Sequence, residues 1–155
     1  MPLRLSTTLE NWLRTGSFGP LNVGDSASDV VALLGRTEVF GPKQGISFPG
    51  YWLYDEVEFG FGEDTKIKWI QSDTVRIESA RAAPLFVDID WQGIIDRMPL
   101  QLCLEWLDDH GLQHRHWLDD DGGKIVVENR TQMLLTESDV PRLVTIWSPA
   151  SSNDQ

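Results

Sequence analysis

Apolar residues recur at helical spacing in three stretches of the chain, and these stretches predict three helices. The helices are expected at residues 7–15, 26–35 and 99–110. The second has the strongest local signals, because Ser26 is a good N-cap, Asp29 lies three positions later and Gly35 can end the helix. In the first helix, Thr7 and Glu10 have the spacing of a capping box.

Outside the helices the hydrophobic period changes to two, which indicates β-strands. Short strands are expected at residues 51–54, 57–61, 67–69, 75–77, 85–90, 112–118, 124–128, 131–136 and 142–147. Glu56 and Glu58 form the polar positions of one strand, and Lys66 and Lys68 those of the next. We therefore expect a hairpin in which these opposite charges pair across the two strands.

The order of these elements predicts an α+β fold. Short turns between successive strands imply an antiparallel sheet of meandering strands, with the helices packed on one face. A helix followed by a meander occurs twice, at residues 25–77 and 99–147, without a convincing repeat of residues. Residues 79–84 are the only weak candidate boundary, so residues 1–148 are expected to form one domain and residues 149–155 a frayed tail.

Composition narrows the class of protein further. Hydrophobic residues make up 41% of the 155 positions, which is ordinary for a globular chain and too high for a disordered one. No apolar run approaches the roughly 18 residues of a membrane helix, and the first residues hold no signal-peptide stretch. The single cysteine, Cys103, cannot form an internal disulfide. We therefore expect a cytoplasmic protein that does not insert into a membrane.

The formal net charge of −11 restricts the partners that the protein can bind. Negative charge repels phosphate backbones and anionic lipid surfaces, so nucleic acid and membranes are disfavoured. A basic protein is a compatible partner, because opposite charge accelerates its capture. The alternative is that the charge serves solubility alone.

Two histidines form the strongest candidate for metal chemistry. His114 and His116 alternate on an expected strand, so both rings lie on one side, and Asp119 or Asp121 could supply a third ligand. The alternative is a solvated strand face, because the acidic residues fall in a turn.

Signals for catalysis are absent from the sequence. It has no G-x-S-x-G motif, no phosphate-binding glycine loop and no zinc-type cysteine pair. Cys103 lies on the apolar face of the third helix, where burial would make its thiol inert. We therefore expect no enzyme activity and no cofactor.

Aromatic residues beside acidic ones suggest a protein-binding surface. Alternation places Trp52 and Tyr54 on one face of their strand and Tyr51 on the other. With Glu56 and Glu58 they form the candidate partner contacts, because exposed aromatic residues are common anchors of interfaces. The alternative is that all the aromatic side chains belong to the core.

About a third of the chain resembles a known group of proteins. Residues 22–35 (NVGDSASDVVALLG), 51–54 (YWLY) and 57–61 (VEFGF) resemble small bacterial immunity-like proteins encoded beside genes of polymorphic toxin systems. The order of helix, loop and aromatic strands is also similar to the β-lactamase-inhibitor-like domain of some envelope lipoproteins. The chain departs from the latter, because it lacks a signal peptide and a lipid-anchor cysteine near its start.

The resemblance implies a binding module whose partner is a cognate toxin, and it assigns no functional residue. The net charge favours a basic toxin domain. The sequence thus predicts a non-catalytic, acidic protein-binding module, of the type that inhibits a cognate toxin. Two alternatives stay open. One is a metal-binding protein or metal-dependent enzyme that uses His114 and His116. The other is a structural or self-associating protein.

Overall fold

The computed structural model describes residues 5–37, 39–41, 48–74, 86–120 and 122–149. Their helices are α1 (Leu9–Thr15), α2 (Ala27–Leu34) and α4 (Leu100–Asp109). Their strands are β1 (Leu5–Thr8), β2 (Phe40–Gly41), β3 (Gly50–Tyr54), β4 (Val57–Phe61), β5 (Ile67–Asp73), β6 (Val87–Asp90), β7 (His114–Asp119), β8 (Gly122–Val127), β9 (Thr131–Leu135) and β10 (Leu143–Pro149). No helix in these ranges is long and apolar enough to cross a membrane.

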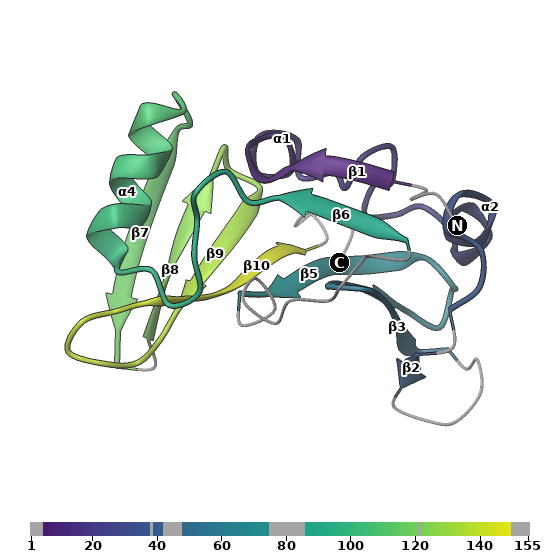
Figure 1. Ribbon diagram of the computed structural model, residues 1–155. Coiled ribbons are helices and arrows are strands. Elements are labelled where there is room, and N and C mark those ends of the chain that lie inside the picture. Colours follow the sequence, from purple (N-terminus) through teal and green to yellow (C-terminus); the bar gives the residue numbers. More distant parts are fainter. Residues whose placement is uncertain (1–4, 38, 42–47, 75–85, 121, 150–155) are drawn as a thin grey trace.

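Most of the strands belong to one antiparallel sheet with the order β2-β3-β4-β5-β10-β9-β8-β7 (Figure 1). One meander, β2 to β5, follows α2, and a second, β7 to β10, follows α4. The last strands of the two meanders pair with each other, with Ile146 opposite Ser72. The predicted α+β class and the repeated helix-plus-meander order are confirmed.

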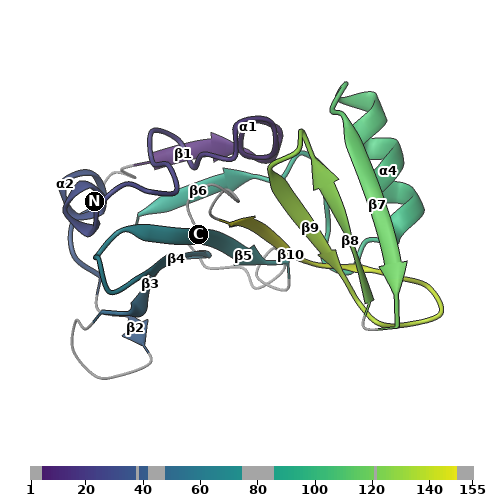
Figure 2. The ribbon, with the colours of Figure 1, turned by 180° about the vertical axis from the view of Figure 1, so that it is seen from behind.

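A second, two-stranded sheet was not predicted from the sequence. Strands β1 and β6 pair in parallel, from Leu5 opposite Val87 to Thr8 opposite Asp90. Figures 1 and 2 show that this pair and α1 lie over one side of β5 and β10, while α4 lies beside β7 and β8. The predicted antiparallel sheet is confirmed for the eight large-sheet strands, and the parallel β1–β6 pair adds to it.

Capping chemistry explains where the first two helices begin. The Ser26 side chain accepts a hydrogen bond from the Asp29 N–H at 3.1 Å, and the Asp29 carboxylate accepts one from the Ser26 N–H at 3.0 Å. This is the reciprocal pair that the sequence predicted. In α1 the N-cap is Thr8 and not Thr7, and the Glu10 N–H donates elsewhere, so the capping box predicted there is wrong.

The core lies between the sheet and the elements on its covered side. Alternate residues along the strands are buried there: Trp52, Tyr54, Val57, Phe59, Ile70, Ile125, Val127, Met133 and Ile146. They pack with Leu9, Trp12 and Leu13 of α1, Val30 and Leu34 of α2, and Cys103 and Leu107 of α4. Within this core the Trp12 indole N–H donates to the Ser148 hydroxyl at 2.8 Å, which ties α1 to β10.

The charge pairing predicted for the first hairpin is wrong in register. Strands β4 and β5 do form an antiparallel hairpin, but Glu58 lies opposite Gln71. A bulge shifts the register between Gly60 and Phe61, and Lys68 instead forms an ion pair with Asp64 of the turn at 2.9 Å. Bulges of this kind insert one residue into a strand, so simple alternation cannot predict the pairs beyond them.

The remaining fold predictions concern the C-terminal tail, the strand at 75–77 and the boundary at 79–84. Pro149 is the last residue of β10, opposite Trp69, and not part of the predicted tail. Residues 150–155, the predicted strand at 75–77 and the candidate boundary at 79–84 lie outside the described residues.

Candidate functional site

The second face of the eight-stranded sheet is the main candidate for a functional surface. Its residues alternate with those of the core and are partly or fully exposed. We call it the open face; its members are Tyr51, Leu53, Glu58, Trp69, Gln71, Asp73, Arg115, Trp117, Asp119, Lys124, Val126, Gln132, Leu134, Thr145 and Trp147. Among the described residues, the helices and the β1–β6 pair lie on the other side of the sheet (Figures 1 and 2).

Two aromatic rings of the open face lie over glycines of the neighbouring strand. Trp69 of β5 lies opposite Gly60 of β4, and a Cβ atom on Gly60 would come within 1.9 Å of the Trp69 indole. Tyr51 of β3 lies opposite Gly41 of β2, where a Cβ would come within 2.3 Å of the Tyr51 ring. Each ring thus fills the space that a side chain on the adjacent strand would take, which limits its motion.

Hydrogen bonds add order to this part of the open face. The Trp69 indole N–H donates to a carboxylate oxygen of Glu58 at 2.8 Å. On the seam between the two meanders, the Thr145 hydroxyl donates to Asp73 at 3.0 Å. Trp69 is therefore a partly exposed tryptophan held by its hydrogen bond to Glu58, and Asp73 lies four positions further along β5.

At the far end of the open face the charges have the opposite sign. The Trp117 side chain is 45% exposed and lies between two cations. The Arg115 guanidinium is 5.3 Å from the centre of the Trp117 ring, and the Lys124 ammonium is 5.7 Å from it. Both distances are within the range of cation–π attraction. Aromatic residues therefore mark both ends of the face, with acids near β4 and β5 and bases near β7 and β8.

The structure separates the predicted partner contacts. Tyr51 and Glu58 lie on the open face. Trp52 and Tyr54 are core residues with 4% and 0% of their surface exposed, so predicting them as contacts was wrong. The Tyr54 hydroxyl donates to the Gly35 carbonyl at 2.7 Å, and burial raises the pKa of Tyr54 to about 12. The predicted alternation of the strand is confirmed, but of these three aromatic residues only Tyr51 lies on the exposed face of the strand.

Glu56 has a structural contact instead of a place on the open face. It is the second residue of the tight turn between β3 and β4, and its carboxylate accepts a hydrogen bond from the Ile89 N–H of β6 at 3.1 Å. Its neighbour Asp55 accepts from the N–H groups of Phe86 and Val87 at 2.6 and 2.9 Å. Burial raises the pKa of Glu56 above its ordinary value, and the Ile89 N–H offsets part of that effect. The two carboxylates thus attach β6 to the main sheet.

The candidate metal ligands do not come together. His114 and His116 share one side of β7, but the alternation of the strand places Asp119 on the other side. His114 Nε2 lies 2.7 Å from a carboxylate oxygen of Asp108. Asp121 lies outside the described residues, and within the described ranges no group of three His, Cys, Asp or Glu residues could hold a metal. Asp119 therefore does not join the two histidines, and the alternative that uses Asp121 stays a prediction.

Cys103 lies on the apolar face of α4, as the sequence predicted, and is fully buried. Burial raises the pKa of its thiol to about 12, so the nucleophilic thiolate is scarce at neutral pH.

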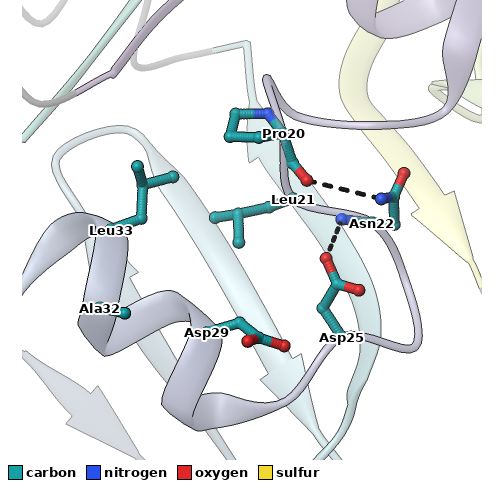
Figure 3. A pocket seen from close by; sticks show the side chains of 7 residues that line it. All are labelled: Pro20, Leu21, Asn22, Asp25, Asp29, Ala32 and Leu33. Atoms are coloured by element: carbon teal, nitrogen blue, oxygen red, sulfur yellow. Dashed lines mark hydrogen bonds between the residues drawn. The ribbon is translucent and has the colours of Figure 1, made fainter.

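A shallow hollow beside α2 is a second concave feature (Figure 3). It has a volume of about 520 Å³ and is lined by Pro20, Leu21, Asn22, Asp25, Asp29, Ala32 and Leu33. Its two carboxylates already hold backbone groups: Asp25 accepts from the Asn22 N–H at 2.8 Å, and Asp29 caps the helix. These carboxylates therefore shape the loop and begin the helix.

Sequence reasoning missed Trp69, Trp147 and Trp117 as members of one surface. In the sequence, these tryptophans stand at alternate positions of expected strands. The same alternation is equally compatible with a buried face, so it could not identify them as a surface. Only the pairing of β5 with β10 brings Trp69 and Trp147 onto the same face. Comparison of the chain with protein-family models, curated proteins and solved structures finds no match.

Proposed function

We propose that the protein is a non-catalytic protein-binding module that holds its partner on the open face. The observation that carries this proposal is the set of exposed or partly exposed aromatic side chains on this face, Tyr51, Trp69, Trp117 and Trp147, of which Tyr51 and Trp69 are held over glycines of the neighbouring strands. Large aromatic residues that lose little conformational freedom on binding are the usual anchors of protein interfaces. Around them, Leu53, Val126 and Leu134 supply apolar area.

The charge of the molecule supports a basic partner. The net charge is −11, and Glu58 and Asp73 flank the aromatic residues in one half of the open face. Long-range attraction would raise the rate of association with a basic protein and would weaken with salt. Together with the resemblance of residues 22–61 to immunity-like proteins, this favours an inhibitor of a cognate toxin in the cytoplasm. Such an inhibitor would act by covering the toxin's active site or a groove beside it.

Affinity capture with matched baits tests the proposal. The wild-type protein and variants Trp147→Ala and Tyr51→Ala would be used to capture proteins from the source lysate at low and high salt. The control is Leu102→Ala, which removes an exposed apolar side chain from α4, away from the open face. We expect one dominant basic partner that the wild type and the control retain, and that both face variants and high salt release.

Two results would contradict the proposal. One is the absence of any specific partner at either salt concentration. The other is a partner that the Trp147 and Tyr51 variants bind as tightly as the control does. Circular dichroism and thermal unfolding of each bait would confirm that the variants retain the fold.

A further inference from the structure

Strand β7 is a long, exposed edge of the large sheet. It is the last strand in the sheet order and pairs only with β8 among the described strands. Five of its six residues, Arg115 to Asp119, are exposed. Its register with β8 is unbroken from His114 to Asp119, and it contains no proline. Natural sheets protect such edges with prolines, bulges, short strands or charged side chains. Strand β7 carries charged side chains but none of the other three features, so its outer backbone groups are accessible to another strand whose charges are complementary.

The free side of β7 presents a defined set of backbone groups. The Glu128 N–H donates to the Gln113 carbonyl at 2.8 Å, so Gln113 and Glu128 form a hydrogen-bonded pair just before β7 begins. This pair determines which residues of β7 direct their backbone groups toward β8 and which direct them outward. Because antiparallel ladders alternate, Arg115, Trp117 and Asp119 direct their backbone groups toward β8. The N–H and C=O groups of His114, His116 and Leu118 then point outward.

The side chains of β7 on the open face form a self-complementary row. Arg115, Trp117 and Asp119 occupy alternate positions, with a cation at one end and a carboxylate at the other. An antiparallel copy of this row, turned about Trp117, places Arg115 of each chain opposite Asp119 of the other. It also places the two Trp117 rings opposite each other. Opposite charges and aromatic pairs in directly facing positions stabilise antiparallel strands.

We propose that two copies of this chain associate through antiparallel pairing of their β7 strands, with the two-fold axis at Trp117. In this register His116 lies opposite Leu118 of the second copy, and both belong to the outward-pointing set, so the new ladder can form. Leu118, which is 52% exposed, lies on the face opposite the open face and would become less exposed in the dimer. Asp119 already has an interaction within its own chain, and a carboxylate has lone pairs for several donors, so it can also accept from Arg115.

The proposed dimer has a consequence for binding. A two-fold axis normal to the sheet joins two eight-stranded sheets into one and keeps both open faces on the same side. The contact pairs two β7 edges, so it can form whether or not the open face binds a partner. It uses Trp117, which leaves Tyr51, Trp69 and Trp147 as the aromatic side chains that each open face presents. A dimer would present two binding faces to partners on one side of the assembly.

Light scattering coupled to size exclusion tests the dimer, because one chain has a mass of 17.6 kDa. We expect the wild type to approach twice that mass as its concentration rises from micromolar to millimolar. Arg115→Asp and Asp119→Arg, made singly, place like charges opposite each other at two symmetric positions. Each should weaken the dimer about tenfold or more, and the double variant Arg115→Asp/Asp119→Arg should restore it.

Two further variants complete the design. His116→Pro removes an outward N–H without removing a bond to β8, so it should abolish the dimer while circular dichroism shows a retained fold. Lys66→Asp makes the same change of net charge as Arg115→Asp at an exposed position directly before β5, far from β7 in the sheet order, and should leave dimerisation within twofold of the wild type. A wild-type mass of one chain at every concentration overturns the proposal. Folded single charge variants that dimerise like the wild type, or a double variant that fails to regain the dimer, overturn it as well.

Discussion

Replacing Gly60 by alanine tests how Trp69 is held on the open face. A Cβ atom on Gly60 would lie 1.9 Å from Cε2 and 2.1 Å from Cζ2 of the Trp69 ring. Carbon atoms in contact are roughly 3.5–4.0 Å apart, so the indole has to move. Gly60 is not among the glycines with positive φ, so alanine fits its backbone conformation.

The expected change in stability is the sum of two destabilising contributions and one stabilising contribution. Displacing Trp69 breaks its hydrogen bond to Glu58, worth about 1 kcal/mol. Moving the ring off the β4 backbone also exposes on the order of 40 Å² of apolar surface, worth about 1 kcal/mol. Alanine contributes about 0.4–1 kcal/mol in the other direction, because it restricts the unfolded chain. Gly60→Ala should therefore destabilise the wild type by about 1 kcal/mol.

A double-mutant cycle isolates the contact. In a Trp69→Ala background the clash is gone, so the same Gly60→Ala change should stabilise the protein by about 0.4–1 kcal/mol. The two substitutions are then coupled by about 1.5–2 kcal/mol. Urea unfolding of the wild type, both single variants and the double variant measures this coupling. Stabilisation by Gly60→Ala in both backgrounds would show that Trp69 does not lie over Gly60.

Three other predictions concern the core and its titrating groups. Ser148→Ala leaves the buried Trp12 indole N–H without its acceptor and should cost about 1–3 kcal/mol in urea unfolding, whereas Ser28→Ala on the exposed side of α2 should change stability by less than about 0.5 kcal/mol. Cys103 should resist a thiol reagent at pH 8 until the protein unfolds. Because burial raises its pKa, stability should fall as the pH rises above about 8.5, where the unfolded thiol ionises. Burial also raises the pKa of Glu56, so Glu56→Gln should be more stable than the wild type at pH 7. This difference should disappear below the ordinary pKa of 4.5, where the folded and unfolded wild type are both protonated; a difference independent of pH would contradict the assignment.

The helices were predictable because their signals are local. The reciprocal bonds of Ser26 and Asp29 depend on residues three positions apart, and Pro99 and Gly111 lie at the two ends of α4. Strand β1 has only four residues, and its partner begins at Val87, far along the chain. No pattern within Leu5–Thr8 distinguishes a short parallel strand from the approach to a helix, so β1 could not be predicted.

The candidate site was only partly predictable, because alternation separates two faces without saying which is wet. In β3 both faces carry aromatic residues, and burial of Trp52 and Tyr54 follows from the elements packed above them. The register of β4 with β5 contains a bulge, and Gly41 and Gly60 leave room for the rings of Tyr51 and Trp69 on the neighbouring strands. These features are three-dimensional, and the sequence shows only the residues that permit them.

The seam between β5 and β10 makes the open face a property of the whole sheet. Trp69 belongs to the first meander and Trp147 to the second, and the pairing of Gln71 with Trp147 brings them onto neighbouring strands. The Thr145–Asp73 bond lies on the same seam. Neither meander alone presents both tryptophans, so a partner that contacts both can bind only after the two halves have joined. Binding at this surface should therefore stabilise the seam itself, because a ligand that binds the folded state alone shifts the folding equilibrium toward it.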